Sequence, residues 1–315
     1  MDTPPPILPR RDFLRGATAL GLAAWAAPPA RAETSGTRLI LLGTAGGPRP
    51  GLLRHAPAQV IIAGGTPYVV DCGNGVAWQL VRAGVALNRL RHVLLTHHHS
   101  DHNADYGNLL LLAWSVGLAT PVDTWGPPPI ETMTRLFLEL NDYDIQTRIK
   151  DEGRPPLAPL IHVHEFSQPG VVLDDGTVKV TAALVDHPPV VPAFAYRFDA
   201  ADRSIVISGD TAPCDRLVAL ARGADLLVHE ALYLPAVDAL LARVPNAVRL
   251  REHLLASHTT VEDAAKIAAA AGVKTLVLSH LVPADDPAVT DALLIAAAQP
   301  HFAGRIVVGQ DLMAL

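Results

Sequence analysis

The stretch that decides the fold is THHHSDHNAD at residues 96–105, which directly follows the apolar run HVLL at 92–95. We expect this run to be a strand, so His97 and His99 leave it on one side, because side chains alternate along a strand. His98 then points the other way and is not expected to bind a metal. Imidazole and carboxylate are groups that bind zinc and similar divalent ions. The stretch therefore predicts a metal site, with a solvated histidine-rich turn as the alternative.

The composition of the chain narrows the class of protein. The chain has 315 residues, of which 50% are hydrophobic and 18% are charged, which provides a substantial core and excludes disorder. The net charge is −6 and no basic stripe stands out, so we expect neither a nucleic-acid partner nor an anionic-membrane partner. We interpret Cys72 and Cys214 as free, buried residues, with a disulfide as the alternative.

The amino terminus resembles a twin-arginine export signal. A pair of arginines at 10–11 precedes an apolar stretch over 16–27, which is shorter than the about twenty residues of a membrane span. A small-x-small pattern then ends at Ala32 and fits a cleavage site. We predict a signal peptide over 1–32, read by the twin-arginine export machinery, and a periplasmic or secreted single domain over 33–315 without a stable membrane anchor. An uncleaved amphipathic anchor is the alternative.

Short β-branched runs alternate with helical stretches along the rest of the chain. Expected strands cover 37–43, 59–63, 68–71, 92–96, 178–186, 193–199, 204–210 and 275–280. Expected helices cover 75–84, 103–117, 214–223 and 260–272. For the last helix, Thr259 and Glu262 are placed as a capping box and Gly272 as a stop. The alternation predicts one domain of α/β class.

The segment 126–159 is rich in proline, and we expect it to be a loop. With Phe137, Tyr143 and Ile145 it could form a lid or an apolar pocket wall, or a surface loop packed on the core.

The pattern His-x-His-x-Asp-His after an apolar strand resembles the signature of the metallo-β-lactamase superfamily. It is carried here by His97, His99, Asp101 and His102. Three further ligand-type residues follow at later expected strand ends, namely His187, Asp210 and His280. The resemblance implies the α/β fold of that superfamily, a four-layer αββα sandwich, from about Thr37 to the end of the chain.

Other motifs resemble the ribonuclease Z and arylsulfatase-like branch. They are LLGTAGGP at 41–48, VVDCGNG at 69–75, LLVHEA at 226–231 and SHTTVEDAAKIA at 257–268. This likeness implies two divalent metal ions, with Zn²⁺ favoured and Mn²⁺ or Fe²⁺ left open. One ion would be held by His97, His99 and His187, and the other by Asp101, His102 and His280. Asp210 would bridge the two ions.

The same resemblance implies the catalytic residues. His258 would donate a proton to the leaving group, and Asp101 would take part in catalysis as well as in metal binding. Glu230 would orient His258 or be a structural carboxylate. Asp71 could fix the tautomer of a metal-binding histidine or could only form a turn.

We do not expect ribonuclease Z activity itself. Bacterial members of that group carry a long arm that grips tRNA between the positions matching His187 and Asp210, which here are only 23 residues apart. We therefore predict an exported hydrolase for a small ester, such as an aryl or alkyl sulfate, a phosphodiester, a lactone or a carboxylic ester, and no nucleic-acid substrate. A mononuclear iron oxygenase on the same fold and a non-catalytic metal-binding protein are the alternatives. His162 and His164 share a strand face and are interpreted as structural or substrate-facing.

Overall fold

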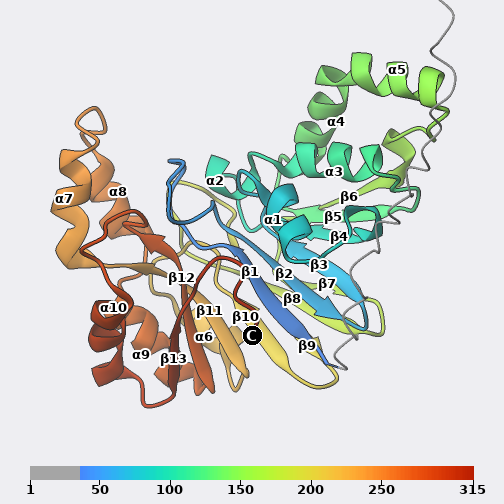
Figure 1. Ribbon diagram of the computed structural model, residues 1–315. Helices are drawn as coiled ribbons and strands as arrows, with labels where there is room; N and C mark the ends of the chain where they lie inside the picture. Colours follow the sequence, from blue (N-terminus) through green and yellow to red (C-terminus); the bar gives the residue numbers. More distant parts are fainter. Residues whose placement is uncertain (1–35) are drawn as a thin grey trace, which may run out of the picture. The chain divides into compact units, whose positions relative to one another are not determined.

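Two β-sheets face each other across a shared apolar core in the computed structural model, which describes residues 36–315 (Figure 1). The first sheet has the order β1-β2-β3-β4-β5-β6. Its strands are β1 Arg38–Gly43, β2 Ala58–Ala63, β3 Thr66–Val70, β4 His92–Leu94, β5 Val122–Gly126 and β6 Ile161–Glu165. Strands β1 to β3 pair antiparallel, and β3 to β6 pair parallel. The parallel strands therefore end at one edge, where polar loops can meet.

The second sheet has the order β13-β12-β11-β10-β9-β8-β7. Its strands are β7 Gly170–Asp174, β8 Val178–Leu184, β9 Phe194–Ala200, β10 Ser204–Ile207, β11 Leu226–Leu232, β12 Thr275–Val282 and β13 Arg305–Val308. Strands β7 to β10 form an antiparallel meander, whereas β10 to β13 are parallel and are joined by helical crossovers. The inner face of this sheet contributes Phe194, Tyr196 and Phe198 to the core between the sheets.

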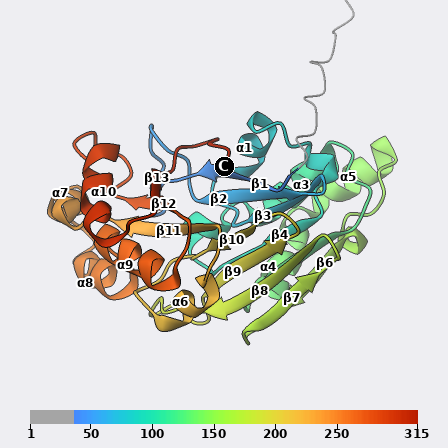
Figure 2. The ribbon, with the colours of Figure 1, turned by 90° about the horizontal axis from the view of Figure 1, so that it is seen from below.

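Helices cover the outer face of each sheet (Figures 1 and 2). Their bounds are α1 Val76–Arg82, α2 Ser100–Asn103, α3 Tyr106–Ser115, α4 Ile130–Leu140, α5 Asp142–Glu152, α6 Asp215–Ala221, α7 Val237–Ala242, α8 Leu250–Ser257, α9 Val261–Ala271 and α10 Asp291–Ala298. Helices α1 and α3 pack on the first sheet, and α6, α9 and α10 pack on the second. The layers run helix, sheet, sheet, helix, which confirms the predicted αββα sandwich.

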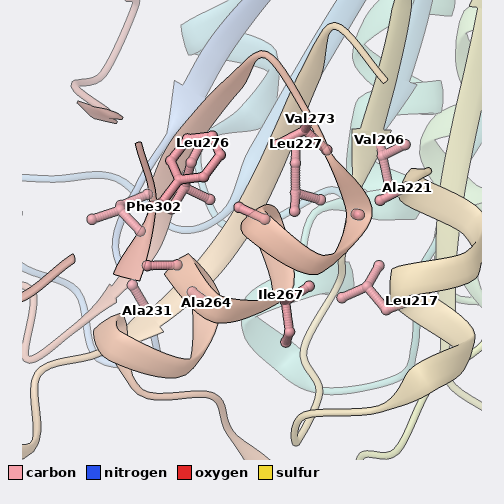
Figure 3. Packing of buried hydrophobic residues seen from close by; sticks show 14 of the residues in the cluster. Val206, Leu217, Ala221, Leu227, Ala231, Ala264, Ile267, Val273, Leu276 and Phe302 are labelled. Carbon is pink, nitrogen blue, oxygen red and sulfur yellow. The ribbon is translucent and has the colours of Figure 1, made fainter. Parts of the chain in front are cut away.

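The outer core under α9 is built largely from small side chains (Figure 3). Ala264, Ala265 and Ala268 are fully buried on one face of that helix, opposite Leu227 and Leu276 of the sheet. Alanine lets a helix lie close to the strands, and each buried leucine side chain stabilises the fold by about 1.5–3 kcal/mol. The sheet that carries several of the site residues is thereby held firmly in place.

Several local predictions need correction. The segment 126–159 is not an unstructured loop, because most of it forms α4 and α5. The cap of α9 is Thr260, whose side chain accepts from the Asp263 backbone N–H, so the predicted capping box at Thr259 was wrong. Thr259 instead donates its hydroxyl to the Thr211 carbonyl. The predicted stop at Gly272 is confirmed, since this residue adopts the left-handed conformation.

Cys72 and Cys214 are free thiols, as predicted, with Cys72 buried and Cys214 half-buried. The predicted signal peptide over 1–32 lies outside the described residues. Among residues 36–315, the structure contains no helix with the length and apolar character that crossing a membrane requires.

Candidate metal centre

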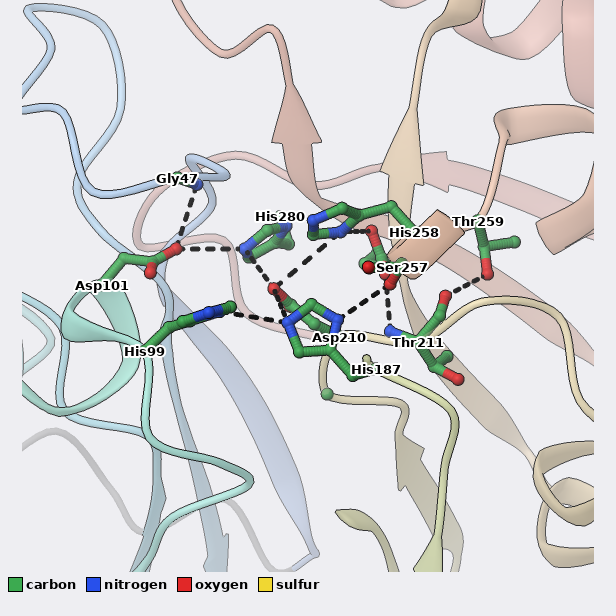
Figure 4. Close-up of polar contacts among 12 residues, drawn as sticks. Gly47, His99, Asp101, His187, Asp210, Thr211, Ser257, His258, Thr259 and His280 are labelled. Atoms are coloured by element: carbon green, nitrogen blue, oxygen red, sulfur yellow. Dashed lines mark hydrogen bonds and ion pairs between the residues drawn. The ribbon is translucent and has the colours of Figure 1, made fainter. Parts of the chain in front are cut away.

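The predicted ligands come from the ends of strands in both sheets. His97 and His99 leave the loop after β4, which ends at Leu94 rather than at Thr96 as expected. His187 follows β8 and Asp210 follows β10. Because these strand ends face the same edge of the sandwich, residues more than 100 positions apart in sequence lie together (Figure 4).

The structure brings all seven predicted ligands into two groups that share one carboxylate. The first group is His97, His99, His187 and Asp210, and the second is Asp101, His102, Asp210 and His280. Within each group one ligand atom per residue lies within 4.8 Å of every other. Asp210 Oδ1 lies 3.3 Å from His102 Nε2, and its Oδ2 lies 3.3 Å from His280 Nε2 and 3.8 Å from His97 Nε2. Asp210 therefore stands between the two groups, as a bridging ligand would.

Neighbouring groups fix the tautomers of the histidines. The Asp71 carboxylate accepts from His102 Nδ1 at 2.8 Å and from the Thr96 N–H at 2.8 Å, so His102 Nε2 turns toward Asp210. His187 Nδ1 donates to the Ser257 carbonyl at 2.8 Å, which turns its Nε2 toward the same centre. Such partners orient metal ligands and raise their basicity. Asp71 is thus more than a turn residue.

Backbone strain is concentrated at this centre. Asp71 and His280 have φ values of +62° and +46°, and Leu312 is the one other non-glycine residue with positive φ within residues 36–315. His280 is also the extra residue of a β-bulge, since Ser279 pairs with Glu230 and Leu281 pairs with Ala231. A bulge re-aims a side chain, and strain of this kind is typical of functional sites. Both features direct His280 into the centre.

The donor set fits divalent ions. Two polar atoms that face the centre are buried without a hydrogen-bond partner among the described residues, namely His102 Nε2 and Asp210 Oδ1. Burial holds the pKa of His97 well below its usual value and lowers that of His187 to about 4. Burial would raise the pKa of Asp210, but His280 and His102 beside it hold that pKa well below its usual value. For these three residues the forms that bind metal, neutral imidazole and ionised carboxylate, are favoured, whereas for His102 and His280 the Asp210 carboxylate outweighs burial and raises the pKa.

His258 and Glu230 form a second, linked unit beside the metal centre. His258 Nδ1 donates to Glu230 Oε2 at 2.8 Å, and Glu230 Oε1 accepts the Thr211 N–H at 2.7 Å. Burial lowers the pKa of His258, but the Glu230 carboxylate outweighs this effect and raises the pKa to about 9. His229, next to Glu230, is buried and bonds to the Glu230 carbonyl, away from both ligand groups. This geometry holds the His258 ring through its Nδ1 and places it beside Asp210.

His98 lies outside the ligand groups, in agreement with the expectation that it points away. Its Nε2 donates to the Pro127 carbonyl at 2.8 Å, and its Nδ1 lies 3.1 Å from Asn103 Nδ2. His162 and His164 also lie elsewhere, on β6, where both contact Asp123 of β5. They neither face the cavity of the metal centre nor belong to its ligand groups.

A cavity of about 350 Å³ opens onto the metal centre. One wall is the loop from Gly46 to Arg49, and the opposite wall is formed by α7, α8 and the segment between them. No residue of 126–159 lines this cavity, so that segment is not its wall. The cavity also contains His253 of α8, which was missed because a lone histidine within a helix gives no sequence signal.

Comparison with known proteins agrees with this geometry. Residues 66–281 match the model of the β-lactamase superfamily domain. A protein named ribonuclease Z from Mycobacterium sp. (strain KMS) is 39% identical over 86% of this chain and 93% of its own length. The chain belongs to the metallo-β-lactamase superfamily.

Solved structures of this superfamily show the same fold. The metallo-β-lactamase fold protein YhfI from Bacillus subtilis aligns with a TM-score of 0.65 at 23% identity, over 89% of this chain and 98% of its own. The short form of human tRNase Z aligns with a TM-score of 0.64, also at 23% identity, over 88% and 98% of the two chains.

These relatives correct the predicted partner. The expectation of a small-molecule substrate and no nucleic acid was wrong, because the superfamily relative at 39% identity is named a ribonuclease. The short connection between His187 and Asp210 was given too much weight. This chain covers 93% of that relative, so the ribonuclease Z name extends to proteins of closely similar length. Net charge was also a poor guide, since it averages the whole surface and says little about a substrate phosphate held at a metal centre.

Proposed function

We propose that this protein is a hydrolase with two divalent metal ions that cleaves a phosphodiester bond in RNA. The observation that carries the proposal is the placement of Asp210 between two complete ligand groups. The ribonuclease Z name of a relative at 39% identity supports RNA as the substrate. The histidine and aspartate donors suit Zn²⁺.

The metal ligands would be the seven residues of the two groups. When bound, two divalent ions supply Lewis-acid activation of a water molecule and of the phosphoryl group. Asp210 belongs to both ligand groups and would link them. Gly47 orients Asp101 by donating its N–H to Asp101 Oδ2 at 3.0 Å. Burial of these carboxylates keeps competing water away from their oxygens.

His258 is the proton donor of the proposed reaction. Its Nδ1–H is held by Glu230, so Nε2 carries the proton that can pass to the departing oxygen. Burial lowers the exposure of this proton to bulk water, and the Glu230 carboxylate stabilises the protonated ring until transfer. The cavity beside His258 gives the substrate access to both the ligand groups and the acid.

The first test is metal content and activity of one purified preparation. We expect about two zinc ions per chain by elemental analysis, and cleavage of an RNA hairpin with a single-stranded 3′ extension. Asp210→Asn should lose both metal and activity, whereas Asp215→Asn, on the exposed start of α6, should keep both.

The outcome of that test separates the alternatives. One iron per chain without hydrolysis would favour the oxygenase. Absence of metal after reconstitution would favour neither enzyme. Two zinc ions with intact RNA and rapid hydrolysis of an aryl sulfate would refute RNA as the substrate.

We also propose that residues 1–32 direct twin-arginine export to the periplasm or beyond. The paired arginines at 10–11 and the small residues before Glu33 support this proposal. Replacing both arginines with lysine should stop processing, and amino-terminal sequencing of the exported protein should begin at Glu33. Export of the lysine variant at the normal level would contradict the proposal of twin-arginine export.

A further inference from the structure

The cavity beside the metal centre has one apolar wall, and its polar lining residues are mainly the candidate ligands and their neighbours. Its volume of about 350 Å³ is within the range of small-ligand sites. The apolar residues come from α7, α8, the segment between them and β12, namely Leu240, Val244, Leu250, Leu254 and Val282. A surface of this kind suits the flat face of a nucleobase better than it suits a phosphate.

His253 is the polar group on this wall closest to the metal ligands. Its ring centroid lies 5.8 Å from that of His99, 5.9 Å from that of His187 and 5.4 Å from that of His258. It belongs to none of the ligand groups found within residues 36–315. The mechanism above therefore leaves this half-buried histidine without a role.

The hydrogen bonds around Ser257 fix the tautomer of His253. The Ser257 hydroxyl donates its one proton to the Pro188 carbonyl at 2.5 Å, because a carbonyl can only accept. Ser257 Oγ must then accept from His253 Nδ1–H, which lies 3.3 Å away. With Nδ1 donating to Ser257, the lone pair of the neutral His253 ring is on Nε2, and within residues 36–315 this atom makes no hydrogen bond.

A substrate that fills this cavity must offer an apolar face to the wall and a donor to His253. A ribonucleoside offers both, since its base is flat and its 2′-hydroxyl can donate. Arg49 on the opposite wall is a guanidinium suited to a flanking phosphate. A deoxynucleoside has no 2′-hydroxyl and would leave His253 Nε2 without a hydrogen-bond donor from the substrate.

We propose that the cavity holds the ribonucleoside next to the scissile phosphate, with its base on the apolar wall and its 2′-hydroxyl donating to His253 Nε2. His253 is then a specificity residue that favours RNA over DNA. This inference rests on the proposed function, because it requires a nucleic-acid substrate at the metal centre.

The test compares His253→Leu with the unchanged protein on matched substrates. The substrates are the RNA hairpin and a set in which single nucleotides around the cleavage site are 2′-deoxy. In the unchanged protein, one 2′-deoxy position should lower kcat/KM by about threefold to tenfold, as expected for one hydrogen bond. His253→Leu should lower kcat/KM on all-ribose RNA by a similar factor and lose the penalty at that position alone.

Two further variants and one further substrate exclude a structural explanation. His253→Gln keeps an acceptor oxygen and should retain part of the 2′-hydroxyl preference. Glu252→Gln, an exposed neighbour on α8, should behave as the unchanged protein. Bis(4-nitrophenyl) phosphate has no ribose, so its hydrolysis and the metal content should be unaffected by His253→Leu.

The outcomes separate this inference from the proposed function. If the unchanged protein cleaves RNA but His253→Leu keeps the full 2′-deoxy penalty, the role of His253 is refuted and the proposed function stands. The same holds if His253→Leu loses metal or slows both substrates equally. If the unchanged protein cleaves no RNA, both the role of His253 and the proposed function are refuted.

Discussion

Glu230→Gln tests whether the protein uses His258 as its proton donor. Glutamine keeps an Oε1 oxygen for the Thr211 N–H but replaces the Oε2 acceptor of His258 Nδ1 with a donor. The variant therefore removes one buried, charge-assisted hydrogen bond and leaves the size of the side chain unchanged. Such a bond is worth about 1.5–3 kcal/mol, so kcat should fall by about tenfold to 150-fold.

The assay is single-turnover cleavage of the RNA hairpin, together with zinc content and thermal unfolding. Zinc content should not change, because the two Glu230 oxygens are bonded to the Thr211 N–H and to His258 Nδ1. His258→Ala should lower kcat by about 10²–10⁴-fold. Adding Glu230→Gln to the His258→Ala variant should lower kcat no further. Glu252→Gln is the matched control on an exposed site.

Three results would refute this reasoning. If Glu230→Gln lowered the zinc content, Glu230 would act on the metal centre and not on His258. If the double variant were slower than His258→Ala, Glu230 would have a role that does not pass through His258. Unchanged kcat in both single variants would remove the pair from the mechanism altogether.

Further predictions concern the metal, the backbone and one surface ion pair. Chelation of zinc should lower the melting temperature and zinc addition should restore it, because the ligands join strands of both sheets. Asp71→Asn should weaken zinc binding by about 10–100-fold, since it no longer fixes the His102 ring. Gly43→Ala should destabilise the fold by about 1–3 kcal/mol in urea titrations, because its Cβ would overlap the Ala56 carbonyl. The Lys274 hydrogen bond lowers the pKa of Asp225 to about 2, so the extra stability over Asp225→Asn should be complete above about pH 4 and vanish toward pH 2.

The candidate ligands could be named from the sequence because four of the seven lie in one short motif, from His97 to His102. The resemblance of that motif to the superfamily implied the other three, which follow short β-branched runs that are recognisable as strands. A strand end at the polar edge of a sheet is where the chain must turn, so a ligand-type residue there has few other roles. The β-bulge at His280 was not predictable, because it depends on pairing with β11.

The cavity wall could not be predicted, because it has no local signature. The segment from Leu234 to Leu254 contains short helices whose apolar residues are also typical of ordinary packing. Segment 126–159 was misjudged for a related reason: its prolines lie before Ile130 and after Glu152, where they flank two helices and do not interrupt them. The positions of the prolines, more than their number, decide whether the segment can form helices.

The candidate metal ligands and most of the apolar wall of the cavity come from different parts of this fold. The ligands are fixed by two sheets and by buried partners such as Asp71, so altering one of them disturbs the whole centre. The apolar wall comes chiefly from α7, α8 and the segment between them, which follow β11 and lie at the edge of the sandwich (Figure 1). This segment meets the candidate ligands mainly at the end of α8, where the Ser257 carbonyl accepts from His187 Nδ1. Since a common metal centre serves many hydrolases, we expect the choice of substrate to depend on this wall, on which His253 is the one polar residue beside the candidate ligands.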